Sequence, residues 1–119
     1  MVKIVMFVTM YSCMLFAQNS TDSESLLERD CLNCHREQQI PNVLIYRRYL
    51  MKYSTTKHME EAIFSYLNNP NKKTSIMPPQ FFLKFPMKEK LSLEDKTLRK
   101  NIQNYLKRFD IRKYIIVEK

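Results

Sequence analysis

The chain has 119 residues, with 20 lysines and arginines against 12 aspartates and glutamates and a hydrophobic fraction of 45%. These values fit one small globular domain and exclude a collagen-like, wholly disordered or multi-span membrane protein. Glycine is absent, which excludes Gly-rich phosphate-binding loops, dinucleotide-binding fingerprints and Asn-Gly hairpins, because each of these needs glycine. The composition favours a helical chain whose loops are marked by Pro and Asn.

Residues 1–17 have the pattern of a secretory signal peptide, with one lysine, an apolar stretch and a small residue at the end. The apolar run is shorter than the roughly 20 residues that span a bilayer, so we expect cleavage and a mature domain of residues 18–119. An uncleaved anchor and lipid attachment at Cys13 are the alternatives. After cleavage only Cys31 and Cys34 remain, in an oxidising compartment.

The first predicted helix spans residues 22–34 and leads into a chemically distinctive motif. A Thr-x-x-Glu sequence that starts at Thr21 indicates a capping box. The sequence Cys-Leu-Asn-Cys-His then runs from Cys31 to His35, and C-x-x-C-H is the attachment sequence of c-type haem. On a helical turn both thiols project from one face and can form thioethers with the haem vinyl groups, while the His places its imidazole under the iron.

Three other interpretations of the cysteine pair stay open from sequence. A thioredoxin-like redox pair uses C-x-x-C beside a βαβ unit, and no such pattern surrounds this pair. A zinc site needs four ligands, and only His35 and His58 are available to join the two cysteines. A plain disulfide across so short a loop gains little entropy. Haem attachment is the favoured interpretation.

Two more helices are predicted before a proline-rich segment. Apolar residues recur at helical spacing over residues 42–53, with basic residues on the other face, and over residues 56–68, where the period is clearest. Residues 70–91 contain four of the five prolines and predict an extended but apolar loop.

A C-terminal helix is predicted over residues 93–109, behind a second capping box that starts at Ser92. No helix or strand is assigned to residues 110–119. Their apolar residues either pack back onto the domain, fray into solvent or contact a partner. The expected fold class is all-α.

The order of helix, C-x-x-C-H, Pro, two helices, Met-Pro-Pro and last helix resembles the small monohaem class I cytochromes c of bacteria over nearly the whole expected mature chain. The resemblance implies a cytochrome c-like bundle of about four short helices around one covalently attached haem c, held by Cys31 and Cys34. It also implies His35 as the proximal iron ligand and a Met from the proline-marked loop as the distal one. Met77, followed by Pro78, matches that position, and a thioether ligand favours Fe(II).

Other residues compete for the distal position or complete the expected haem site. Met87 is the rival methionine in the same loop, and His58 is the candidate for bis-His ligation, although a solvated His is the usual state near a helix start. The carbonyl of Pro41 is positioned in sequence to accept the Nδ1 proton of His35. The remaining candidate haem contacts are Tyr49, Pro78 and Phe81.

Two departures from the family concern packing. The first and last helices of these cytochromes cross closely with the help of a Gly, and here Leu26 or Leu27 against Tyr105 must fill the crossing. Residues 81–87 look like an insertion after the ligand loop, whose phenylalanines either cover a haem face or form an exposed apolar patch.

The expected function is one-electron transfer in the periplasm by a protein that is not itself an enzyme. The basic surplus predicts docking onto an acidic face of an oxidase, a reductase or another cytochrome, unless the lysines only maintain solubility. Nucleic acid is not an expected partner, and membrane contact is expected only if the signal segment is uncleaved or lipidated. The alternative is a haem protein that binds or senses a small gas at an open or weakly ligated sixth position. The candidate docking lysines are Lys72, Lys73, Lys84, Lys88 and Lys90.

Overall fold

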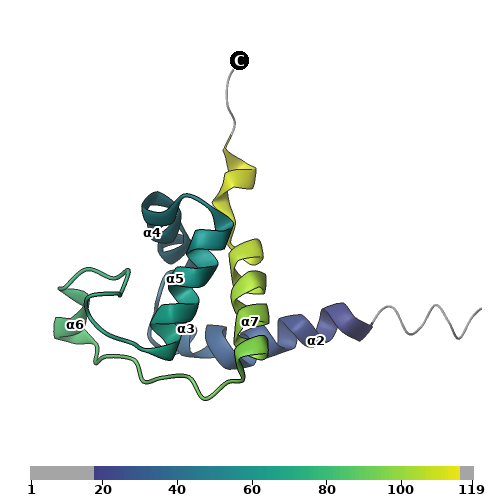
Figure 1. The fold of residues 1–119 in the computed structure, drawn as a ribbon, viewed down its shortest axis with the longest axis horizontal. Coiled ribbons are helices and arrows are strands. Elements are labelled where there is room, and N and C mark those ends of the chain that lie inside the picture. The colour runs from purple at the N-terminus through teal and green to yellow at the C-terminus, as the bar shows by residue number, and fades with distance from the viewer. Residues whose placement is uncertain (1–17, 116–119) are drawn as a thin grey trace, which may run out of the picture.

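The computed structural model describes residues 18–115, with side chains from residue 23 onward, and this part of the chain forms helices and no strands. The all-α prediction is confirmed for these residues. Figure 1 shows α5 beside α7, α2 across the start of α7, and a long loop that carries α6 on the far side of α5. The elements are α2 (Gln18–Leu27), a π-helical turn (Glu28–Leu32), α3 (Asn33–Glu37), α4 (Asn42–Tyr53), α5 (Thr56–Asn68), α6 (Phe81–Lys84), α7 (Asp95–Arg108) and a 3₁₀ turn (Ile111–Tyr114).

The predicted signal peptide at residues 1–17 lies outside the described residues. Among the helices that the structure describes, none is long and apolar enough to cross a bilayer.

The first helical segment is longer than predicted and changes its winding before the cysteine motif. Thr21 lies inside α2, so the prediction that it caps the helix start is wrong. The backbone N–H of Asn33 donates to the carbonyl of Glu28, which is the wider hydrogen-bond spacing of a π-helix. Such single π turns in longer helical runs are frequent at functional sites.

Helices α4 and α5 match their predicted bounds. Helix α4 starts after Pro41, whose carbonyl accepts the first helical hydrogen bond from the amide of Ile45 at 3.1 Å. Helix α5 is capped by Thr55, whose hydroxyl accepts the backbone N–H of His58 at 3.2 Å. Local capping chemistry thus fixes both helix starts.

The absence of glycine leaves its usual positions to other residues. Gln39, after α3, has φ 53°, and Ser54, after α4, has φ 64°. These are left-handed values at helix ends, where glycine is the usual residue because it has no Cβ.

The core lies where α2, α4, α5 and α7 meet. Leu27, Tyr46, Met59 and Leu98 are almost fully buried there. Helix α2 contacts α7, and Leu27 of α2 is buried in the core. The hydroxyl of Tyr46 donates to Asp110 at 2.9 Å, which satisfies its polar end inside the core.

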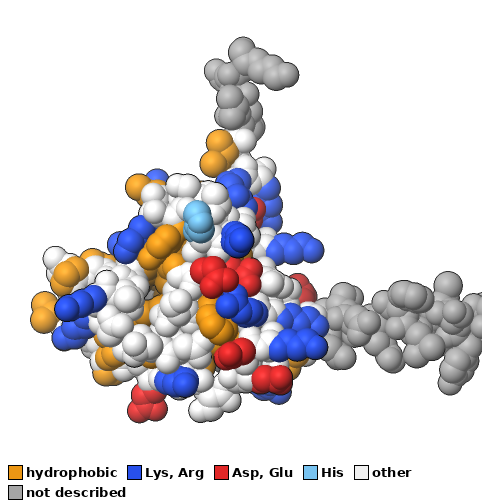
Figure 2. Space-filling view, viewed as in Figure 1, with side chains coloured by type: hydrophobic (Ala, Val, Ile, Leu, Met, Phe, Trp, Pro, Cys, Tyr) orange, Lys and Arg blue, Asp and Glu red, His pale blue; other side chains and the backbone are white. Residues whose placement is uncertain are grey.

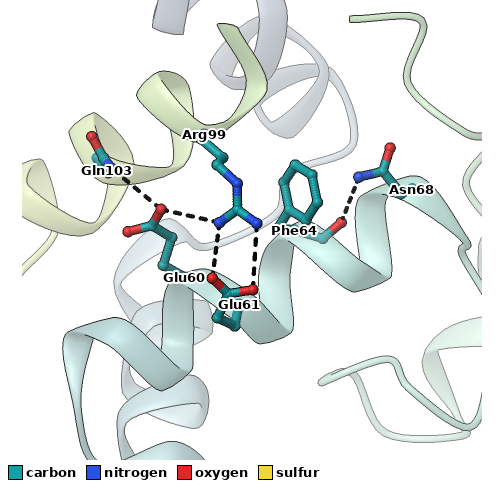
Figure 3. A network of polar contacts seen from close by, with 6 residues as sticks. All are labelled: Glu60, Glu61, Phe64, Asn68, Arg99 and Gln103. Carbon is teal, nitrogen blue, oxygen red and sulfur yellow. Dashed lines mark hydrogen bonds and ion pairs between the residues drawn. The ribbon is translucent and has the colours of Figure 1, made fainter. Parts of the chain in front are cut away.

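A polar network joins the exposed edges of α5 and α7. The Arg99 guanidinium lies 3.9 Å from the centre of the Phe64 ring and donates to Glu61 at 2.9 Å, as Figure 3 shows. Glu60 accepts from Arg99 at 3.5 Å and from Gln103 at 3.2 Å. A guanidinium that both stacks on an aromatic ring and binds a carboxylate through two N–H groups fixes the relative position of the two helices more precisely than an isolated surface ion pair.

Two predictions in the C-terminal half need correction, and the structure shows where the first residues of the C-terminal tail lie. The loop of residues 70–91 contains α6. Helix α7 has Glu94 at its N-cap with no side-chain capping bond, so Ser92 does not form the predicted capping box. Beyond α7, Ile111 packs against the core whereas Ile115 is exposed, and residues 116–119 lie outside the described part.

Candidate functional site

The C-x-x-C-H motif straddles the junction between the π-helical turn and α3. Cys31 is half-buried and Cys34 is exposed, and both are free thiols. Burial raises the pKa of Cys31 to about 11, and the charge of Asp30 adds to the rise. The Cys31 thiol is therefore protonated at neutral pH.

These properties bear on the other interpretations of the cysteines. A reactive redox cysteine has a lowered pKa, whereas the pKa of Cys31 is raised. Residues 18–115 contain no group of three or more His, Cys, Asp and Glu side chains placed to hold a metal ion. His58, the remaining histidine, is exposed at the start of α5, as expected for a solvated side chain. The geometry gives no support to a redox pair or a zinc site.

His35 is held by a side chain that the sequence analysis did not single out. Its Nδ1 lies 2.5 Å from Oδ1 of Asn42, the first residue of α4. The Tyr105 hydroxyl donates to the same oxygen at 3.0 Å, and its ring meets the His35 ring edge-on with centroids 5.7 Å apart. The predicted bond from His35 to the Pro41 carbonyl is not made. Nδ1 of His35 bonds to Asn42 instead, and the Pro41 carbonyl accepts the amide of Ile45 at the start of α4.

The surroundings of His35 favour its neutral form. Burial lowers the pKa of His35, and nearby Lys88 lowers it further, while the hydrogen bond with Asn42 opposes the change. Because Oδ1 of Asn42 accepts the proton on Nδ1, the Nε2 atom is left as the lone-pair donor. A neutral imidazole with a fixed Nδ1 is the form that ligates a metal.

The π-helical turn is fastened to α7 by polar contacts on both sides. Asn101, which is 1% exposed, donates to Asp30 at 3.0 Å. Glu28 accepts from Arg108 at 2.9 Å and from Arg36 at 2.8 Å. The bonds from Asn101 and Arg108 fix the residues just before Cys31 against the last helix.

Aromatic side chains extend from the motif toward the long loop. Burial raises the pKa of Tyr105, and Tyr49 and Cys31 add to the rise, which places the three groups near one another. Tyr49 is in turn close to Tyr66, whose hydroxyl donates to Sδ of Met87 at 3.8 Å. Tyr49, a predicted haem contact, therefore lies near the motif.

The next residue along the loop, Lys88, is half-buried and acts electrostatically on both Cys31 and His35. Lys88 of the long loop thus lies within electrostatic range of the motif.

The other predicted haem contacts have their described interactions within the long loop itself. The amide of Met77 donates to Ser75 Oγ at 3.1 Å, and its side chain is half-buried. The carbonyl of Pro78 accepts from the amide of Phe81, whose ring stacks on Phe85 at 4.8 Å between centroids.

A pocket of about 380 Å³ opens beside His35. Most of its walls are polar, and Glu28 bridges Arg36 and Arg108 at its side. Such walls suit a small polar molecule or water better than an apolar macrocycle, whose binding sites are mostly apolar. The lining residues are Glu28, Leu32, His35, Arg36, Gln39, Ile40, Asn42, Arg108 and Phe109.

No family model, no curated protein and no solved structure matches this chain. The assignment of function therefore depends on the chain's own residues.

Proposed function

We propose that the protein is an exported, periplasmic monohaem c-type cytochrome that carries one electron between partner proteins. The observation that carries the proposal is the C-x-x-C-H motif on a helical turn, with the Nδ1 of His35 fixed by Asn42. Cys31 and Cys34 would hold the haem through thioethers, and Nε2 of His35 would hold the iron.

Several residues of the motif have the chemistry that a covalently attached haem needs, although the polar pocket beside His35 does not by itself suit a macrocycle. Two free thiols lie one helical turn apart, burial favours the neutral imidazole of His35, and Tyr49 and Tyr105 supply buried aromatic surface beside Cys31. When attached, the haem would supply an iron that cycles between Fe(II) and Fe(III). The protein would fix the proximal ring, shield the site from water and set the potential through the ligands and their hydrogen bonds.

We propose Met77 as the distal ligand, with Met87 as its rival. The Met-Pro-Pro sequence supports Met77, because it resembles the ligand loop of class I cytochromes c. The contact with Tyr66 and the position of Lys88 beside the motif support Met87. Either thioether would favour Fe(II) and raise the potential, as a carrier requires.

A gas-binding or gas-sensing haem protein is the second candidate. In this candidate neither methionine ligates the iron: Sδ of Met87 already accepts the Tyr66 hydroxyl, and the described bond of Met77 is made by its backbone amide and holds the residue in its own loop. If neither methionine ligates the iron, the sixth position would be open to a diatomic ligand.

The redox partners we propose are an oxidase, a reductase or another cytochrome with an acidic docking face. Lys72, Lys73, Lys84 and Lys90 are exposed on the long loop. Their charge would accelerate encounter with an acidic partner and make the rate sensitive to salt.

The deciding experiment is visible spectroscopy of protein matured in a periplasm that attaches haem c. Oxidised and reduced spectra, with and without carbon monoxide, are compared for the wild type, Met77→Ala and Met87→Ala. For a carrier we expect a low-spin reduced spectrum, a far-red sulfur-to-iron band in the oxidised protein and no response to carbon monoxide. Loss of the far-red band in one variant alone identifies the ligand.

Two other outcomes would change the conclusion. A high-spin wild-type spectrum that shifts with carbon monoxide would establish the gas-binding candidate. Protein without covalent haem would refute both candidates.

A further inference from the structure

The outer face of α4 carries a regular surface pattern that the haem site does not use. Val43, Arg47 and Met51 form one row at a spacing of four residues, and residues at this spacing lie on one side of a helix. Val43 is 54% exposed and Met51 is 78% exposed. Leu44, which is 40% exposed, begins a parallel row that continues with Arg48 and Lys52.

The positive charge of these rows has no counterpart in the described part of the molecule. No acidic residue occurs between Glu37 and Glu60 in the sequence. The six described ion pairs involve other basic residues of the chain. The acidic side chain with a described contact to α4, Asp110, already binds Arg112.

Arg48 adds an unsatisfied polar atom to this face. Its Nε is buried and has no hydrogen-bond partner within the described residues. Buried side-chain donors in folded proteins almost always have a partner. This face is therefore partly apolar and positively charged, and the buried Nε of Arg48 beneath it has no hydrogen-bond partner among the described residues.

From these features we propose that the outer face of α4 is a docking surface for an acidic protein partner with an apolar centre. Carboxylates of the partner would pair with Arg47 and Lys52, and its apolar centre would cover Val43 and Met51. A second copy of this chain is a poor occupant, because two cationic faces repel each other. An anionic membrane fits less well, because Arg47 interrupts the apolar row where a membrane-bound helix would be continuously apolar.

The position of α4 connects this surface with the proposed haem site. The first residue of α4, Asn42, holds His35, and the inner face of the helix contributes Tyr49. An α-helix with its side chains is about 10–12 Å across, so a partner docked on α4 would lie one helix away from His35. This electron-transfer consequence rests on the proposed function, whereas the docking itself does not.

The test measures binding of a synthetic glutamate-rich peptide with a central Leu-Phe pair by calorimetry and by amide chemical shifts of the full protein. Arg47→Glu/Lys52→Glu is compared with Lys96→Glu/Lys100→Glu, which makes the same change in net charge at two exposed positions of α7. Met51→Ser is compared with a substitution of equal chemistry on α6, Leu83→Ser, since Leu83 is 89% exposed. Thermal unfolding of every variant verifies folding.

We expect the peptide to shift amides of α4, and both α4 variants to weaken binding about tenfold or more. The α7 and α6 variants should change affinity by less than about threefold. Equal weakening by the α7 variant would overturn the proposal, because binding would then follow net charge. Equal binding of a peptide with Gln in place of Glu would also overturn it.

Vesicles of phosphatidylglycerol and phosphatidylcholine form the last arm. Binding to vesicles but not to the peptide would replace the protein partner with a membrane and refute the proposal. The visible spectrum of the same samples reports haem attachment separately. Peptide binding through α4 in protein without haem would therefore support the proposed docking surface and refute the proposal that the protein is a cytochrome.

Discussion

The hydroxyl of Tyr105 offers a sharp test of how the chain would control its iron. It shares the Oδ1 acceptor of Asn42 with Nδ1 of His35, at 3.0 Å and 2.5 Å respectively. Tyr105→Phe removes the hydroxyl and keeps the ring, which packs on His35 and Phe109. In the variant, Oδ1 of Asn42 serves His35 alone and becomes a stronger acceptor of the Nδ1 proton.

A stronger acceptor makes the imidazole a better electron donor, which stabilises Fe(III) and lowers the reduction potential. A typical hydrogen bond contributes about 0.5–1.5 kcal/mol net. The free-energy change from strengthening the bond between Asn42 and His35 should not exceed this range. Since 1.4 kcal/mol corresponds to about 59 mV for one electron, we expect the potential to fall by up to roughly 20–60 mV. The free energy of unfolding should fall by about 1 kcal/mol for the lost bond.

Spectroelectrochemical titration of the haem-loaded protein measures the potential, and denaturant unfolding measures the stability. Tyr49→Phe is the matched control, because Tyr49 is also buried and has no described bond to Asn42. A potential that rises, stays constant or moves equally in the control would refute the tuning role. A fall in stability alone would show that the Tyr105 hydroxyl is only structural.

Three further predictions concern the framework that holds the motif. Asn101→Leu leaves the buried side of Asp30 without its donor, so we expect a loss of about 1–3 kcal/mol in the free energy of unfolding, and an unchanged value would contradict the role of this bond. The folded-state pKa of Asp110 lies below its ordinary value of 3.8, so its contribution to stability is complete above that pH and is lost as the pH falls. Acid unfolding curves should show a smaller decline below about pH 4 in Asp110→Asn. Arg99→Lys keeps the charge but loses the fork to Glu61, and thermal unfolding should report a lower melting temperature, with an unchanged value refuting the network's contribution.

Local signals in the sequence predicted much of the fold. The apolar periods of α4 and α5 coincide with their observed bounds because proline and threonine residues fix both starts locally. The two capping boxes failed for a related reason. Thr21 and Ser92 have the right neighbours, but α2 already includes Thr21 and α7 starts only at Asp95, and a capping pattern alone does not fix where a helix begins.

The site was only partly visible in the sequence. Spacing alone singled out Cys31, Cys34 and His35 for the proposed site, because haem attachment would need them on one turn. Asn42 was missed, although an amide at the start of a helix soon after the motif is a detectable signal. Tyr105 could not be found, because its contact with Asn42 joins residues 63 positions apart and no local pattern encodes such a pairing.

The polar bonds that surround the motif also impose an order on folding. The bond from Asn101 to Asp30 spans 71 residues, and that from Arg108 to Glu28 spans 80. Contacts this distant form late, because the long intervening loop must close first. A chain that emerges N-terminus first presents Cys31 long before α7 arrives, whereas Cys34 stays exposed even in the folded structure. Cys31 is thus most accessible for the proposed covalent attachment during the interval in which the chain still lacks its last helix.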